Sequence, residues 1–499
     1  MSVDITPLSV RTKTTPGPAP GGLGRGLFAT STIQSGEDIL TVSTPFVAVL
    51  DTQRLGDTCS GCLGRSSLEP QDNLRACTAC QVVKYCDKTC QAKDWKFAHQ
   101  LECRIFQKLK PNILPNNARA MLRMVLRSKR GKYDGEELEL FSQLDTHIKE
   151  IREENPDQWE RISLSSKAVK AYSATPMSEE AIAAYGARLD MNAFNLVDAF
   201  YDRIGLYVHP YAAIINHDCN PNAVTGFDGD TLYIKALRAI QKDEQICITY
   251  IDVTESVQVR RTQLRDRYFF DCGCSKCKAD LAQPPYSFLP NPSAQAPMTP
   301  DITEAMAHGI LEQCAGGEPD EAAAAAPRLE TTMRALHDAT WPITHQPLLT
   351  LRDELINSLI CGGRYNAGFI HAAIRYRRVD PIVYPSATHP VRQLHAWVLV
   401  RLATFLLGDI KPEKDCPVAL ETLELDLSLL IWSILSKIMS ELDVACVVPG
   451  FASMVRERFE SATEQFSGAG LDPERMGDEI EREWGKLEKA MSIVVDGGC

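Results

Sequence analysis

The sequence predicts a multidomain α+β protein, in which a β-rich part is interrupted by a zinc finger and followed by an all-α part. Three observations support this fold class. Eight Cys and His residues cluster between Cys59 and Cys103, short strand-like segments flank that cluster, and helical patterns occupy residues 301–499. A chain of 499 residues also exceeds a single hydrophobic core. We expect two to four units, at roughly 100–200 residues per domain.

The composition is that of an ordinary globular protein, with 44% hydrophobic and 24% charged residues. Its longest apolar stretches, such as "AWVLVRLATFLLG", are short and contain Arg401, so we expect no membrane span. The N-terminus lacks the apolar region of a secretory signal, which predicts a reducing compartment, the cytoplasm and nucleus. The net charge of −12 disfavours a general nucleic-acid binder and suits a basic peptide substrate.

The first cysteine cluster has the spacing of metal ligands, C-x2-C-x14-C-x2-C-x5-C-x3-C-x8-H-x3-C. This density of close pairs predicts two tetrahedral zinc sites and argues against buried free thiols. Cys86 and Cys90 are four residues apart, as are His99 and Cys103, and each pair is expected on one helical face. The spacing alone does not say which pairs share a zinc. The predicted ligands are Cys59, Cys62, Cys77, Cys80, Cys86, Cys90, His99 and Cys103.

A second cysteine group, in "FFDCGCSKC", supplies Cys272, Cys274 and Cys277. Three thiolates leave a tetrahedral zinc one ligand short. The fourth position is either open, as in a catalytic site, or filled by a distant residue. Cys219 is the first candidate, and Cys247 in the strand-like "QICITYID" is its competitor.

A candidate site is indicated by polar residues in a segment that favours neither helix nor regular strand. The segment "NHDCNPNA", from Asn216, has poor helix propensity and favours turns or irregular backbone. Gly24 and Gly26 allow the backbone to approach a ligand closely. "GDTLYIKALRAIQKDEQICITYID" reads as strand, turn and strand, with turns at Gly229-Asp230 and Lys242-Asp243 and with Tyr250 near its end. "MNAFNLVD" precedes these segments.

Together these segments resemble a SET domain, the fold of many protein lysine methyltransferases. The resemblance rests on Gly24-Arg25-Gly26, Asn216-His217 with Cys219, Tyr250 and the three later cysteines. The first cluster, including "KYCDKTCQAKDWKFAHQLEC", resembles a MYND zinc finger. A MYND finger within a SET domain is similar to the SMYD family, in a fungal-type or divergent form. The departures are Asp218, where the family more often has Ser, and Asp243-Glu244-Gln245 in place of a Gly-Glu-Glu-like turn.

The resemblance implies an S-adenosylmethionine-dependent protein-lysine N-methyltransferase that acts on histone or other proteins. It also implies three zinc ions, with one held by Cys59, Cys62, Cys86 and Cys90 and another by Cys77, Cys80, His99 and Cys103. Tyr250 would be the catalytic residue, and His217 would do structural and cofactor work. The implied cofactor-binding residues are Gly24, Arg25, Gly26, Asn192, Asn216, His217, Tyr250 and Phe270. The implied lining of the lysine channel is Phe194, Tyr207 and Tyr268.

The resemblance also implies an order of domains along the chain. The N-terminal SET part is followed by the finger, a helical insert, the core SET part, a post-SET zinc segment, a Pro-rich linker and a TPR-like helical domain. In that order the boundaries are 1–58, with 1–20 flexible, then 59–103, 104–190, 191–270, 271–280, 281–300 and 301–499.

The segment 104–133 carries nine Lys or Arg and no Asp or Glu, with Arg119, Arg123 and Arg127 on one helical face. Two interpretations remain open, a solvated face and a weak DNA-contacting or acidic-partner surface. A rival function also remains, that of a catalytically weak or silent adaptor whose MYND finger binds Pro-rich peptides. We expect a monomer.

Overall fold

The computed structural model describes residues 9–22, 24–65, 73–290, 299–314, 319–408 and 410–498. The chain divides into two compact units. The first comprises Met1–Ile251, Arg261–Cys274 and Val447–Phe451, and the second comprises Asp252–Arg260, Ser275–Cys446 and Ala452–Cys499. Part of the predicted linker, 291–298, lies outside the described residues.

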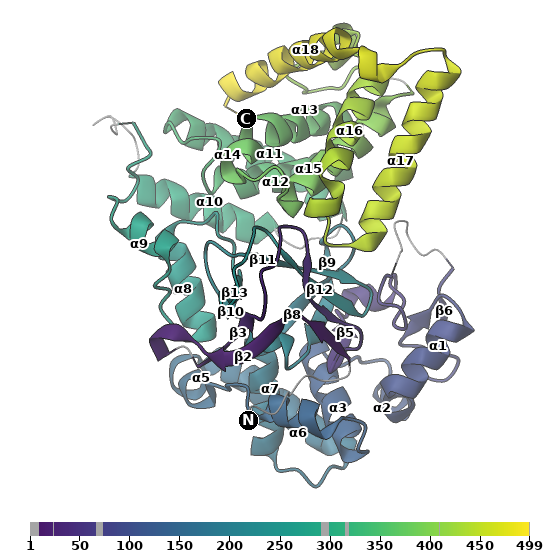
Figure 1. The fold of residues 1–499 in the computed structure, drawn as a ribbon, viewed down its shortest axis with the longest axis vertical. Helices are drawn as coiled ribbons and strands as arrows, with labels where there is room; N and C mark the ends of the chain where they lie inside the picture. Colours follow the sequence, from purple (N-terminus) through teal and green to yellow (C-terminus); the bar gives the residue numbers. More distant parts are fainter. Residues whose placement is uncertain are drawn as a thin grey trace. The chain divides into compact units, whose positions relative to one another are not determined.

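Small antiparallel and mixed sheets form the β-rich part of the first unit (Figure 1). Their strands are short and rich in buried Val, Ile and Leu, which suits half-buried pleated strands. One sheet has the order β1 (Val10–Thr12), β4 (Asp38–Val42), β12 (Thr231–Ala236) and β11 (Ala223–Asp228). A second has β10 (Asn216–His217), β13 (Gln245–Ile248), β3 (Arg25–Ala29) and β2 (Thr14–Pro18). A third has β5 (Val47–Leu50), β9 (Arg203–Val208) and β8 (Phe194–Val197).

The predicted strand, turn and strand pattern after β11 is confirmed. Gly229, between β11 and β12, has a φ of 61°, and Asp243, just before β13, has a φ of 65°. Such left-handed residues allow the tight reversals that these turns need. The strand β10 then pairs in parallel with β13, with Asn216 opposite Cys247 and His217 opposite Ile248. This pairing places the Asn-His dipeptide beside the strand that leads to Tyr250.

A group of helices follows the zinc finger and packs on one side of the strands (Figure 1). Side-chain caps start several of these helices, because Asp134, Asn155 and Ser178 accept hydrogen bonds from backbone N–H groups of the first turns of α4, α6 and α7. The helix α3 is buried along most of its length, against α6, α7 and β5. The helices are α2 (Gln100–Leu109), α3 (Asn116–Lys129), α4 (Gly135–Ser142), α5 (Ile148–Glu154), α6 (Pro156–Ser173) and α7 (Glu179–Asn192).

The prediction of a DNA-contacting surface at Arg119, Arg123 and Arg127 is wrong. The three side chains are only 4%, 8% and 7% exposed. Arg119 donates to the carbonyl oxygen of Leu50 at 2.8 Å, and Arg123 makes a two-pronged contact with the Glu102 carboxylate at 2.7 and 2.8 Å. Arg127 donates to a backbone carbonyl of the zinc finger at 2.6 Å. These guanidinium groups therefore satisfy buried acceptors and do not face solvent.

The zinc finger contains β6 (Arg75–Ala76), β7 (Lys84–Tyr85), α1 (Lys88–Asp94) and a π-helical turn, Trp95–His99, that continues into α2. The side chain of Asp87 accepts a hydrogen bond from the backbone N–H of Cys90 at 2.8 Å and so caps α1. Cys86 therefore precedes the helix. The expectation that Cys86 and Cys90 share one helical face is wrong, because the helix begins only after Asp87.

The second unit is helical, as predicted for the C-terminal region (Figure 1). Many of its helices pack on the helix that follows in the chain, as α11 on α12, α12 on α13 and α15 on α16. The helices are α9 (Ser275–Leu281), α10 (Pro300–Cys314), α11 (Pro319–Asp338), α12 (Leu348–Cys361), α13 (Tyr365–Ile374), α14 (Asp380–Val383), α15 (Pro390–Leu406), α16 (Leu427–Ala445), α17 (Pro449–Gly468) and α18 (Gly477–Asp496). The helix α8 (Val257–Tyr268) crosses the division between the units, as does the first turn of α17.

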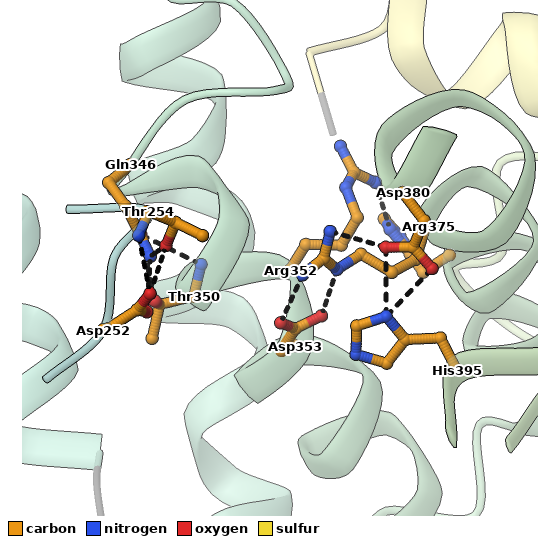
Figure 2. A network of polar contacts seen from close by, with 10 residues as sticks. Asp252, Thr254, Gln346, Thr350, Arg352, Asp353, Arg375, Asp380 and His395 are labelled. Atoms are coloured by element: carbon orange, nitrogen blue, oxygen red, sulfur yellow. Dashed lines mark hydrogen bonds and ion pairs between the residues drawn. The ribbon is translucent and has the colours of Figure 1, made fainter. Parts of the chain in front are cut away.

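A buried ion network holds the centre of this helical unit together (Figure 2). The guanidinium of Arg375 contacts the carboxylates of Asp353 and Asp380, each at 2.8 Å. The Nδ1 atom of His395 lies 2.9 Å from the Asp380 carboxylate, which has no exposed surface. These residues come from α12, α15 and the π-helical turn Arg375–Val379 that leads into α14. Buried charges are stable only when paired in this way.

Across the described ranges, every helix is too short or too polar to span a bilayer.

Candidate active site and metal centres

The two predicted zinc sites of the finger are brought together by the fold. The ligand atoms of Cys59, Cys62, Cys86 and Cys90 all lie within 4.8 Å of one another, as do those of Cys77, Cys80, His99 and Cys103. The interleaved pairing implied by the resemblance is confirmed. The Sγ atoms of Cys62 and Cys86 are 3.7 Å apart, and those of Cys77 and Cys103 are 3.8 Å apart. A tetrahedral zinc with Zn–S bonds of about 2.3 Å requires S···S edges of about 3.8 Å.

The two finger sites differ in their exposure. Every ligand of the second group is buried, and His99 has no exposed surface. In the first group only Cys59 is buried, and Cys86 is exposed. The donor sets of both groups fit zinc, but the first is open to solvent on one side.

The third group consists of Cys219, Cys272, Cys274 and Cys277, whose ligand atoms also lie within 4.8 Å of one another. The Sγ atoms of Cys219 and Cys272 are 3.9 Å apart. Cys219 is thus the fourth ligand, and the open-position alternative is wrong. Cys247 is not part of the group, and burial raises the pKa of its thiol to about 12. Four thiolates fit a closed structural zinc site.

The glycine segment lies against Asn216. Gly24 has a φ of 72°. A Cβ atom at Gly26 would lie 2.4 Å from the Gln245 amide nitrogen and 3.1 Å from that of Asn216. Only glycine therefore leaves room for these two amides. The buried Nε2 of Gln245 has no hydrogen-bond partner in the part of the chain that the structure describes, whereas the Asn216 amide donates to the carbonyl oxygen of Arg25 at 2.9 Å.

His217 is buried and joins two parts of the site. Its Nδ1 atom accepts a hydrogen bond from the backbone N–H of Tyr250 at 3.1 Å. Its Nε2 atom lies 3.2 Å from the Sγ of Cys219. The imidazole ring is also 5.3 Å from the ring of Tyr250 and 6.1 Å from that of Phe270, measured between centroids.

Tyr250 follows β13 and is partly buried. Its hydroxyl donates to the carbonyl oxygen of Ile215 at 2.5 Å, and its ring centroid is 4.9 Å from that of Tyr268. Burial, followed by the neighbouring Tyr268 and Cys247, raises the pKa of Tyr250 above its ordinary value. The hydroxyl is therefore neutral at physiological pH.

Asn192 and Phe194 border a loop that the sequence did not indicate. The Asn192 amide donates to the carbonyl oxygens of Arg188 at 2.8 Å and Asp145 at 3.4 Å. Phe194 begins β8 and is half-buried. The guanidinium of Arg25 donates to the side-chain oxygen of Gln143 at 2.8 Å. The loop after α4 thus lies beside two predicted cofactor residues. Its residue types carry no motif, so only the fold reveals it.

Tyr207 was predicted to line the lysine channel, but the structure places it in the hydrophobic core. It has no exposed surface, and its ring packs edge-on against Phe227 at a centroid distance of 5.1 Å. Its hydroxyl is buried without a hydrogen-bond partner among the described residues. All residues of β9 from Ile204 to Val208 are buried, so this side chain lies in the core. Tyr268 and Phe270 do lie near Tyr250 and His217.

Comparison with known families agrees with this geometry. Residues 24–251 match the family model described as "SET domain". The "SET domain and MYND-type zinc finger protein 6" of Schizosaccharomyces pombe is 32% identical over 52% of this chain and 50% of its own length. "Histone-lysine N-methyltransferase SMYD3" of Homo sapiens is 29% identical over 51% of this chain and 59% of its own length. The chain therefore matches little more than half the length of these curated relatives.

A solved structure described as "Crystal structure of the SET domain of LSMT bound to Lysine and AdoHcy" is 14% identical and covers 95% of both chains. Its TM-score of 0.26 is too low to support an argument about this fold. The family match and the interleaved cysteine groups carry the assignment instead. Residues 24–251 match the SET domain family, and the predicted resemblance of the chain to the SET and MYND proteins is confirmed.

Proposed function

We propose that the protein is an S-adenosylmethionine-dependent protein-lysine N-methyltransferase that acts on histone or other proteins. The observation that carries this proposal is the position of Tyr250. Its hydroxyl is bonded to the Ile215 carbonyl, its backbone N–H is bonded to His217, and Asn216 is bonded to the glycine segment at Arg25. A SET domain with these residues in contact has the parts needed to align a methyl group and an amine.

The residues around Gly26 suit S-adenosylmethionine. The amide nitrogen of Gln245 is a buried donor that meets no acceptor among the residues the structure describes, and a buried donor without an acceptor costs about 1–3 kcal/mol. A ligand with nitrogen and oxygen acceptors would remove that cost. Asn216, Asn192 and the backbone of Gly24 to Gly26 would contact the same ligand, and Phe270 would cover its adenine ring. When bound, the cofactor supplies an electrophilic methyl group on a sulfonium.

The neutral hydroxyl of Tyr250 orients the lysine amine. Because it donates its only proton to the carbonyl oxygen of Ile215, its oxygen can only accept from a second partner. An amine N–H is such a partner, and accepting it turns the nitrogen lone pair away from the hydroxyl. Tyr250 therefore acts by positioning the nucleophile and not by removing its proton.

The target lysine must lose its proton before attack. A free lysine has a pKa of about 10.4, so it is mostly charged at neutral pH. Aromatic side chains at Tyr250, Tyr268 and Phe194 would surround the amine with few polar groups, which disfavours the ammonium form. The net charge of −12 would attract basic protein segments that carry such lysines.

The experiment is transfer of labelled methyl groups from S-adenosylmethionine to separated core histones and to a cell extract, with zinc-loaded protein. Label on lysine that is lost in a folded Tyr250→Phe variant is the expected result. Tyr172→Phe is the matched control, because Tyr172 is 42% exposed on α6. Absence of label, together with absence of cofactor binding in calorimetry, would refute the proposal.

The exposure of Trp95 supports a second function of the finger, the binding of Pro-rich peptides. Trp95 is 45% exposed on the π-helical turn that also carries His99. An exposed indole is the kind of surface that Pro-rich peptides contact. Binding of such a peptide to a monomeric protein, measured by calorimetry and lost in Trp95→Ala, would establish this role. Equal binding by wild type and Trp95→Ala would refute it.

A further inference from the structure

Both nitrogen atoms of His217 are engaged. Nδ1 accepts the backbone N–H of Tyr250 at 3.1 Å. A nitrogen that accepts from an N–H group carries no proton of its own, so in the neutral ring the proton is on Nε2. That atom faces the Sγ of Cys219 at 3.2 Å, which is within the reach of an N–H···S hydrogen bond. The geometry therefore fixes the tautomer of His217.

The acceptor of this hydrogen bond is a predicted zinc ligand. Cys219 belongs to the third cysteine group. Four thiolates around Zn²⁺ leave a net negative charge, and an N–H donor to one sulfur stabilises that charge. The same ring thus touches the metal site on one edge and the backbone of the catalytic tyrosine on the other.

We propose that His217 is a positioning residue that couples the third zinc to Tyr250. This inference rests on the proposed function for its catalytic consequence. The zinc fixes Cys219, Cys219 fixes the Nε2 edge of the ring, and the Nδ1 edge fixes the backbone nitrogen of Tyr250. With its ring against Tyr268 and its hydroxyl on the Ile215 carbonyl, Tyr250 then has one position. The third zinc accordingly sets where the catalytic hydroxyl lies.

Two substitutions separate the two edges of the ring. The side-chain oxygen of Asn takes approximately the place of Nδ1, and the side-chain nitrogen of Gln takes approximately the place of Nε2. His217→Asn keeps an acceptor for the Tyr250 N–H and loses the donor to Cys219. His217→Gln keeps the donor to Cys219 and loses the acceptor. A purely structural histidine would not respond differently to the two changes.

Three readouts are needed on the zinc-loaded full chain. These are zinc content with its release to a chelator, hydrogen exchange of the segment 247–251, and kcat and KM for methyl transfer. His209→Gln is the matched control, because His209 is fully buried in the same unit and contacts Ser9 and Glu137 instead. It tests the general cost of replacing a buried histidine.

We expect His217→Gln to keep its zinc, to exchange the Tyr250 amide about tenfold faster and to lower kcat about tenfold, with KM for the cofactor unchanged. His217→Asn should keep the Tyr250 amide protected and release the third zinc about tenfold faster. The inference is overturned if His217→Gln retains wild-type exchange and kcat, or if His217→Asn releases zinc at the wild-type rate.

The experiment separates this inference from the proposed function. If the wild-type protein transfers no methyl group, the proposed function fails. Zinc release and amide exchange then still decide whether the third metal site is coupled to Tyr250. If methyl transfer is present but the two variants behave like His209→Gln, the coupling fails and the enzyme assignment stands.

Discussion

Arg65 donates a hydrogen bond to the Asp230 carboxylate at 2.8 Å, and so attaches the zinc finger to the turn between β11 and β12. Lys93 reaches the other oxygen of the same carboxylate at 2.7 Å. Arg65 follows the ligand Cys62 by three residues, and Lys93 follows the ligand Cys90 by three residues. Both cations are therefore positioned by the first zinc site.

Loss of the Asp230 charge should loosen the finger. Asp230→Asn leaves two cations without their shared partner, and we expect the free energy of unfolding to fall by about 1–2 kcal/mol. Denaturant unfolding of the zinc-loaded protein measures this. Asp38→Asn is the matched control. Asp38 is half exposed, and its contact with Lys235 is long, at 4.0 Å, so little stability depends on its charge. Equal stability of the two variants would contradict the prediction.

The first zinc should leave before the second. Cys86 is exposed, whereas the ligands of the second group are all buried, so a chelator reaches the first ion more easily. Release followed with a coloured chelator should show a fast phase that Cys86→Ala removes. Cys361→Ala should leave the fast phase unchanged, since Cys361 is exposed but belongs to none of the three groups. A single common rate for all ions is the contrary result.

The buried pair of Arg123 and Glu102 should be costly to break. Burial alone would raise the pKa of Glu102, but the Arg123 guanidinium holds it below its usual value. Arg123→Met should lower the free energy of unfolding by about 3–5 kcal/mol, and adding Glu102→Leu should recover part of it. Arg104→Met, on the exposed face of α2, is the control. No recovery in the double variant would contradict this account.

The sign of the pH dependence follows from the lowered pKa of Glu102. A carboxyl with a depressed folded pKa binds fewer protons than its unfolded form, so its contribution is complete above the unfolded value of about 4.3. That contribution is lost as the pH falls through the folded pKa. Acid unfolding of wild type and the double variant should therefore converge at low pH. A constant difference between them at all pH values would exclude Glu102 as the cause.

Methyl transfer should not decline as the pH approaches 10. Burial raises the pKa of Tyr250 above its ordinary value of about 10, so its hydroxyl keeps its proton there. The free lysine substrate meanwhile loses its proton, and the rate should rise. The measurement is kcat/KM against pH. A fall in kcat/KM below pH 10, matched by tyrosinate absorbance that Tyr250→Phe removes, would show that Tyr250 ionises early.

Gln245 should contribute to cofactor affinity. Its amide nitrogen is buried next to Gly26 and Asn216, without a partner within the described ranges. Gln245→Met keeps the volume and removes the donor, and we expect about tenfold weaker binding of S-adenosylhomocysteine in calorimetry. Gln241→Met, at an exposed turn, should bind as wild type does. Unchanged affinity in Gln245→Met would mean that this amide meets another acceptor.

The spacing of motifs predicted those parts of the candidate site whose residues are close together in the sequence. The three zinc groups, the Asn216-His217 segment and Tyr250 lie where the resemblance places them, because ligand spacing and turn residues are local properties. The errors concern burial. Helical periodicity places three arginines on one face of α3, but every face of that helix is covered. Strand patterning likewise could not decide whether Tyr207 faces the core.

Other contacts of the candidate site could not be predicted, because no nearby sequence pattern marks them. The link between Arg25 and Gln143, and the neighbouring contact of Asn192 with Asp145, bring together segments separated by the whole zinc finger or by two helices. Such contacts depend on the packing of α4 against α7, where the rings of Phe141 and Tyr185 lie 5.1 Å apart. Single-sequence patterns carry no information about them.

The sheet order also dictates how a nascent chain is assembled. Leu40 of β4 pairs with Ile234 of β12, while the complete zinc finger ends at Cys103. During synthesis the finger can therefore take up its two ions long before β12 pairs with the second edge of β4, whose first edge pairs with β1. The open edge of β4 is exposed to other chains on the ribosome throughout that interval. Cys277 is the last of the predicted zinc ligands in the chain and follows every strand of the three larger sheets, so the third metal group can close only after all of these strands have been synthesised.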